Sequence, residues 1–78
     1  MFTTNVKKEF YPNGYGISVI TGGYGDANRP FEVAVLKGTE DKWTLCYDTP
    51  ITDDVIGYLT VTEVEDIERQ IQALPAAE

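Results

Sequence analysis

The chain of 78 residues has the length of one small domain and leaves no room for a second hydrophobic core. Its 42% of hydrophobic residues is normal for a globular protein and too high for a disordered one. The absence of histidine excludes histidine-based triads, histidine general bases and histidine-ligated metals. The single cysteine excludes a thiolate zinc site and an intramolecular disulfide.

The net charge of −7 is distributed unevenly along the chain. Residues 1–47 carry five acids and five bases, whereas residues 48–78 carry eight acids against Arg69 alone. Such a surface repels nucleic acid and anionic membranes and attracts basic surfaces, so we expect neither nucleic acid nor a membrane as a direct partner. Net charges of about 2–8 are also usual in small soluble domains, and a merely solubilising acidic face stays open as the alternative.

Four strands are predicted in the first part of the chain. Residues 2–10 alternate apolar and polar side chains, which is typical of a half-buried strand. A Pro-Asn-Gly turn signal leads into a second strand at residues 15–20. A second hairpin is predicted from residues 31–36 and 42–47. We expect Trp43, on the last of these strands, to be buried in the core.

Two helices are predicted in the remainder. The run Thr52–Asp54 is typical of an N-cap with acids in the first turn of a short helix, which Gly57 would end. Thr62 and Glu65 fit a capping box at the start of a second helix. This helix has one narrow apolar stripe, formed by Val64, Ile67, Ile71 and Leu74.

The predicted fold is therefore α+β: an antiparallel four-stranded sheet followed by a short helix and a C-terminal amphipathic helix packed on one face. We expect a single domain over residues 1–78, with the sheet in residues 1–48 and an acidic helical part in residues 49–78. Cys46 lies in an apolar run, which indicates a buried, unreactive thiol and favours a reducing compartment. No apolar run is long enough for a membrane span and no signal peptide is visible, so we expect a cytoplasmic protein.

Residues 21–30 form a loop that is long for a hairpin connection and contains three glycines. It is not a phosphate-binding loop, because no Lys-Ser/Thr pair and no helix follow the glycines. Two interpretations remain: a mobile loop, or a recognition loop in which Tyr24 and Arg29 make the contacts. Tyrosine and arginine are the residue types that dominate binding hot spots.

No catalytic or metal-binding pattern is visible. Asp53 and Asp54 are adjacent and lack the alternating spacing of a calcium loop. A small hydrolase or cation-dependent enzyme would need Asp26 and one of these two acids to converge on one pocket. We therefore expect a non-catalytic binding protein that uses no cofactor and no metal.

The segments Tyr11–Gly16 and Tyr47–Thr60 resemble small open reading frames that are common in phage and prophage genomes. Members with an assigned role resemble anti-defence inhibitors, among them acidic anti-CRISPR proteins that block type I surveillance complexes. The resemblance implies a phage-encoded inhibitor, acting in the cytoplasm of a bacterial host cell, whose carboxylates occupy a Lys/Arg groove that otherwise holds nucleic-acid phosphates. It carries over no individual binding residue.

Duplex DNA presents one negative charge per roughly 1.7 Å of its axis, so a protein that replaces it must display dense carboxylates. The candidate phosphate surrogates are Asp48, Asp53, Asp54, Glu63, Glu65, Asp66 and Glu68. The alternative is a phage accessory or adaptor protein that binds its partner through Tyr24, Arg29 and an exposed sheet edge, by strand addition.

Overall fold

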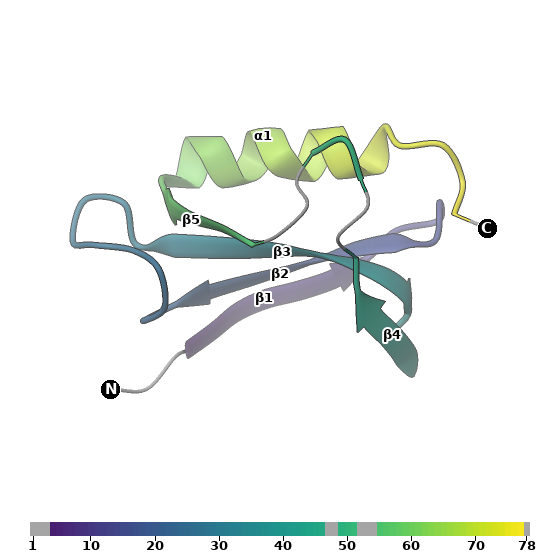
Figure 1. The fold of residues 1–78 in the computed structure, drawn as a ribbon, viewed down its shortest axis with the longest axis horizontal. Helices are drawn as coiled ribbons and strands as arrows, with labels where there is room; N and C mark the ends of the chain where they lie inside the picture. The colour runs from purple at the N-terminus through teal and green to yellow at the C-terminus, as the bar shows by residue number, and fades with distance from the viewer. Residues whose placement is uncertain (1–3, 47–48, 52–54, 78) are drawn as a thin grey trace.

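The structure, a computed structural model, describes residues 4–46, 49–51 and 55–77. The elements in this part of the chain are β1 (Thr4–Phe10), β2 (Tyr15–Thr21), β3 (Phe31–Thr39), β4 (Lys42–Leu45), β5 (Ile56–Leu59) and α1 (Val61–Gln72). The strands form one antiparallel sheet, and α1 lies across one of its faces (Figure 1). The predicted α+β class, with an antiparallel sheet and a C-terminal helix, is confirmed. No helix in the described ranges is long and apolar enough to cross a membrane.

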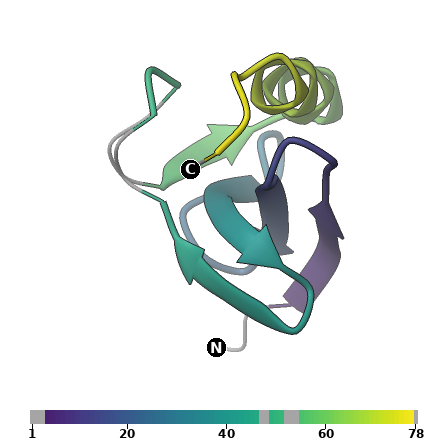
Figure 2. The ribbon, with the colours of Figure 1, turned by 90° about the vertical axis from the view of Figure 1, so that its right-hand side faces the viewer.

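The central strand is β3. It pairs with β2 along one edge, while β4 and β5 share the other edge. On β3, residues Leu36–Thr39 pair with β4. Phe31 and Val33, near the start of β3, pair with β5. β1 pairs only with β2 in the sheet and is therefore an edge strand. Figure 2 shows end-on how strongly the sheet curls beneath the helix.

The main core lies between α1 and the β2–β3 pair. Val64, Ile67 and Ile71 are buried, and these are three of the four predicted stripe positions; Leu74 is partly buried. They belong to one cluster with the sheet residues Ile17, Val19, Val33, Val35, Cys46 and Leu59. The predicted burial of Cys46 is confirmed.

The C-terminal end of α1 is held by the turn between β1 and β2. The side-chain amide of Asn13 donates to the carbonyl oxygens of Ile71 at 2.8 Å and Leu74 at 3.2 Å. The Ala77 amide donates back to the Asn13 carbonyl at 2.7 Å. Gly14, with a φ of 88°, lets the turn close, and a side chain there would collide with Ala77. This turn therefore satisfies carbonyl groups that a helix end leaves without an internal partner.

The predicted start of the C-terminal helix was wrong by two residues. Thr60 is the N-cap: its hydroxyl accepts from the Glu63 amide at 3.3 Å, and the Glu63 carboxylate accepts from the Thr60 amide at 2.9 Å. Both Thr60–Glu63 and Thr62–Glu65 have the spacing of a capping box. The Thr60–Glu63 box is the one that forms. Strand β5 ends at Leu59, so Thr60 is the first residue free to start a helix.

The predicted short helix does not extend to Gly57. Ile56 pairs with Val33 and Leu59 with Phe31, which makes this segment a fifth strand. β4 covers only the C-terminal part of the far edge of β3, so the N-terminal part is available for pairing with β5. The predicted N-cap run Thr52–Asp54 lies outside the described residues.

Trp43 is not in the core, which contradicts the prediction. It lies opposite Gly38, while Leu45 lies opposite Leu36, and alternation along β3 turns these residues away from the helix that Val35 faces. Trp43 is 37% exposed, and the Lys8 ammonium stands 4.5 Å from the centre of its ring. A strand was correctly predicted around Trp43, but the face of the sheet on which Trp43 lies depends on the register between β4 and β3.

The face of the sheet opposite α1 has a buried residue of its own, Leu36, and this gives a first prediction. Leu36→Ala should lower the free energy of unfolding by about 2–5 kcal/mol, because a fully buried side chain leaves a cavity. Leu45→Ala should cost much less, since Leu45 is 43% exposed. Urea unfolding followed by circular dichroism measures both variants. Equal losses would contradict the assignment of Leu36 to a buried environment.

Candidate functional site

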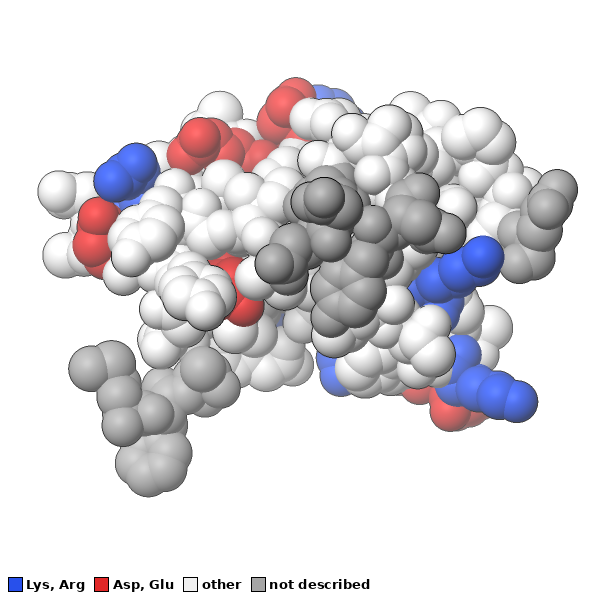
Figure 3. Space-filling model, viewed as in Figure 1, with Lys and Arg blue, Asp and Glu red and all other residues white. Residues whose placement is uncertain are grey.

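The carboxylates of α1 form what we call the acidic face: Glu63, Glu65, Asp66 and Glu68. The first three are exposed and Glu68 is partly buried. Figure 3 shows acidic side chains along the top of the molecule, over the helix. The other three predicted phosphate surrogates, Asp48, Asp53 and Asp54, lie outside the described residues.

Three of the four carboxylates on the acidic face also have structural partners. Glu63 caps its own helix. Asp66 accepts from Arg69 at 3.2 Å and from the Gln70 side chain at 2.9 Å. Glu68 accepts from Lys7 at 2.6 Å. Among the described residues, no side chain is in hydrogen-bond or ion-pair contact with Glu65, so its exposed charge is unpaired there.

Lys7 connects β1 to the helix and belongs to a three-residue ionic network. Its ammonium lies 2.6 Å from Glu68 and 3.0 Å from Glu9. The hydrogen bonds to Glu68 and Glu9 raise the pKa of Lys7 above its ordinary value, so it stays charged. One ammonium between two carboxylates leaves the network negative. The neutral N-terminal part of the sequence and the acidic C-terminal part are therefore interleaved in space.

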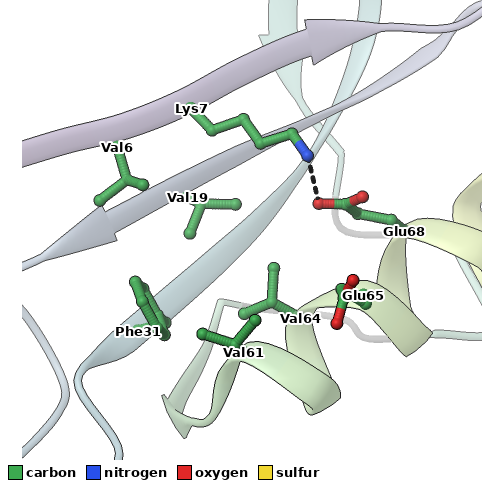
Figure 4. Close-up of a pocket in the computed structure, with 8 residues that line it drawn as sticks. All are labelled: Val6, Lys7, Val19, Phe31, Val61, Val64, Glu65 and Glu68. Carbon is green, nitrogen blue, oxygen red and sulfur yellow. Dashed lines mark hydrogen bonds and ion pairs between the residues drawn. The ribbon is translucent and has the colours of Figure 1, made fainter.

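A groove of about 280 Å³ runs between β1 and the first turns of α1. Val6 and Val61 stand at its surface and are more than half exposed, while Val19 and Val64 are buried. Figure 4 shows Lys7 and Glu68 bonded to each other beside it. The groove is lined by Val6, Lys7, Val19, Phe31, Val61, Val64, Glu65 and Glu68. Sequence reasoning did not find it.

Hydrogen bonds to two carboxylates, Asp26 and Glu32, hold the loop at residues 22–30, which connects β2 to β3. The Asp26 carboxylate accepts from the Asn28 amide at 3.0 Å and the Arg29 amide at 2.7 Å. These contacts, with the Arg29 amide the strongest, hold the pKa of Asp26 below its ordinary value. The Glu32 carboxylate accepts from the Tyr24 amide at 2.8 Å. Both predicted loop residues, Tyr24 and Arg29, are exposed.

A third residue, Tyr58, joins them in what we call the tyrosine surface. The Arg29 guanidinium stands 5.5 Å from the Tyr58 ring, and the Tyr58 amide donates to the Tyr24 carbonyl at 2.9 Å. Tyr58 has a φ of 57°, a conformation that bulky residues rarely adopt and that is often found at functional sites. Gly57 allows this approach, because a side chain there would collide with Tyr24. No sequence signal pointed to Tyr58.

The edge strand β1 is poorly suited to strand addition. Its register with β2 shifts between Asn5 and Lys7, which leaves Val6 as the extra residue of a β-bulge. Bulges and edge lysines are the devices by which sheets avoid pairing with other chains. The edge strand β4 is short, and Lys42–Leu45 are all exposed.

No group of three or more acidic or cysteine side chains able to hold a metal ion occurs in the described ranges. Asp26, which the hydrolase alternative requires, is engaged in its own turn, and Asp53 and Asp54 lie outside those ranges. Comparison of the chain with protein-family models, with curated proteins and with solved structures found no match.

Tyr11 feels the charges of the Lys7–Glu9–Glu68 network, and its titration gives a pH-dependent prediction. Burial raises the pKa of Tyr11 from 10.0 to about 12, and the Glu68 and Glu9 charges add to the shift. The unfolded chain therefore releases this proton at lower pH than the folded protein. The Tyr11 contribution to stability should be constant below pH 10 and should be lost as the pH rises towards 12.

Tyr11→Phe removes this titration. The variant should lose less stability than the wild type between pH 7 and pH 11, measured by urea unfolding at both values. Tyr24→Phe, altered at an exposed tyrosine, is the matched control and should follow the wild type. If both variants followed the wild type, Tyr11 would have the same pKa in the folded and the unfolded chain.

Proposed function

We propose that this protein is a non-catalytic binding protein whose acidic face occupies a basic, nucleic-acid-binding surface of its partner. The observation that carries the proposal is the placement of the helix: the apolar stripe of α1 is buried, whereas three of its four carboxylates, Glu63, Glu65 and Asp66, are exposed. In its most specific form, the protein is a phage-encoded anti-defence inhibitor of the anti-CRISPR kind, and the partner is a host surveillance complex.

The contacts of each carboxylate indicate how it takes part. Glu65 is exposed and unpaired within the described residues, so it is able to meet a partner's Arg or Lys directly. Asp66 is paired with Arg69, but both side chains are more than half exposed, and such surface pairs contribute only about 0–1 kcal/mol. A partner's guanidinium is able to replace Arg69 at little cost. We therefore expect Glu65 and Asp66 to make the main contacts with the partner. Glu63 and Glu68 add negative charge, but their side chains are already bonded within the protein.

The test compares two double variants of equal charge. Glu65→Lys with Asp66→Lys changes the net charge from −7 to −3, because each substitution adds two positive charges. Glu40→Lys with Asp41→Lys makes the same change in the turn after β3. Affinity capture from a bacterial host lysate with wild-type protein, followed by mass spectrometry, defines the partner as a protein that is released as salt rises.

The helix variant should lose this partner, while the turn variant should retain it. A nucleic-acid oligomer added to the captured complex should displace the wild-type protein, because both compete for one basic surface. Equal binding by the two variants would mean that the acidic face serves only solubility. Failure of the oligomer to compete would contradict the phosphate-surrogate mechanism.

A second candidate function is a phage accessory or adaptor protein that binds through the tyrosine surface. It is favoured by the exposed arrangement of Tyr24, Arg29 and Tyr58, since tyrosine and arginine are enriched at binding hot spots.

If the protein is an adaptor, variants of the tyrosine surface and not of the helix should lose the partner. Tyr24→Ala and Arg29→Ala should each weaken capture of the partner, and the helix variant should bind like the wild type. Hot-spot truncations cost about 2 kcal/mol or more, which is roughly thirtyfold in affinity. Ala27→Ser, an exposed change in the same loop, is the control. Unchanged affinity in both alanine variants would rule out the tyrosine surface.

A further inference from the structure

We propose that the groove between β1 and α1 receives an apolar side chain from a partner segment that carries Lys or Arg beside it. This inference rests on the proposed basic partner and adds to it a specific point of contact.

The groove owes its shape to the β-bulge in β1. Asn5 pairs with Ile20 and Lys7 pairs with Val19, so the residue between them has no partner of its own. Val6 and Lys7 consequently both point to the helix side of the sheet, as Figure 4 shows. A regular strand would turn one of them to the opposite face. The bulge therefore adds an apolar wall and a charged end to the same groove.

The lining is apolar at the surface as well as at depth. Val6 is 52% exposed and Val61 is 59% exposed, and they stand on opposite elements. Behind them lie the buried Val19 and Val64 and the partly buried Phe31. Scattered exposed valines are normal, but here two of them flank one recess. An apolar side chain placed between them would remove both from water.

The charges around the groove select what stands next to that side chain. Lys7 is already held between Glu9 and Glu68, and Glu65 has no partner among the described residues. Together these four groups carry one positive and three negative charges. A neighbouring Lys or Arg is therefore attracted, and a neighbouring acid is repelled.

The groove is small, and its surroundings restrict what is able to occupy it. The volume of about 280 Å³ lies at the lower limit of small-molecule sites, which measure roughly 300–1,000 Å³. Strand addition at the same edge is opposed by the bulge and the lysines of β1. A second copy of this acidic chain would bring like charge to the groove. An inserted apolar side chain with a basic neighbour is the occupant that satisfies all three constraints.

Methyl NMR on the full chain tests the proposal with short capped peptides as probes. The three probes are pentapeptides with central sequences Arg-Leu-Arg, Glu-Leu-Glu and Arg-Ser-Arg, flanked by glycine. We expect saturable shifts of the Val6, Val61 and Val64 methyl groups with the first peptide. Binding of the other two should be about tenfold weaker or undetectable, since tenfold corresponds to only about 1.4 kcal/mol. The absence of saturable shifts with Arg-Leu-Arg, or equal affinity for all three, would overturn the proposal.

Substitutions at exposed positions separate the two parts of the site. Val6→Thr with Val61→Thr keeps the side-chain shape and should weaken Arg-Leu-Arg binding at least threefold. Glu65→Gln should reduce the preference for Arg-Leu-Arg over Glu-Leu-Glu. Leu45→Thr, an exposed change on the opposite face of the sheet, is the matched control and should bind like the wild type. Equal weakening in the control would show that the peptides do not use the groove.

The peptide titration requires no natural partner, so its outcome is independent of the lysate capture. If the peptide titration were negative but the helix variant lost capture of the partner, the groove would be refuted and the acidic face would be supported. If the titration were positive but the helix variant still captured the partner, the groove would be supported and the acidic face refuted. Concentration-dependent shifts of the same methyl groups without peptide would identify a second copy of the chain as the occupant and overturn the proposal.

Discussion

The far edge of β3 is shared by two short strands, and the position of every candidate surface depends on this arrangement. β4 occupies the C-terminal part of that edge, and β5 occupies the N-terminal part. Because β5 ends at Leu59, the chain leaves the sheet beside the start of β3, and Thr60 caps a helix that runs back over β2 and β3. The helix stripe then meets the inward side chains of both strands. As a consequence of that packing, Glu63, Glu65 and Asp66 are exposed, and Glu68 lies within reach of Lys7 on β1.

The ionic contact between Lys7 and Glu68 links this helix to the opposite edge of the sheet. Their side chains are 32% and 18% exposed, so the pair is better shielded from water than the exposed Asp66–Arg69 pair. Surface pairs contribute little to stability, and the consequence of this one is mainly positional. It engages Lys7 with Glu68, although Lys7 and Glu65 line the same groove. Within the described residues, Glu65 is the carboxylate of α1 that remains without a partner.

The class of fold was predictable from the sequence because it depends on local periodicity. Alternation marked the strands, and the spacing of Val64, Ile67 and Ile71 marked the buried side of the helix. The errors arose where the decision was not local. The strand at Ile56–Leu59 pairs with residues about 25 positions earlier, and the face of Trp43 depends on its register with Gly38. Which of the two possible capping boxes forms likewise depends on where β5 ends in the sheet.

The candidate surfaces were predictable to a smaller extent. The acids of the helix could be named from the concentration of negative charge in the C-terminal part of the sequence, whereas the partners of Glu63 and Glu68 could not be predicted. The bulge at Val6 and the backbone conformation of Tyr58 leave no mark on composition or spacing. The Asn-Gly turn quoted for the phage resemblance also has a structural task, since Asn13 and Gly14 hold the end of α1. Its presence is therefore explained by folding alone.

The acidic face and the groove differ in the kind of recognition that each provides. Attraction between exposed charges acts over a Debye length of about 8 Å at physiological salt, so it accelerates encounter with any basic surface and discriminates little among them. An apolar recess discriminates by shape, but it attracts nothing from a distance. Glu65 lines the groove and also belongs to the acidic face, so the two features meet at one residue. A basic partner drawn in by the helix would thus be oriented with its cations beside the recess, where an adjacent apolar side chain would determine which partner stays bound.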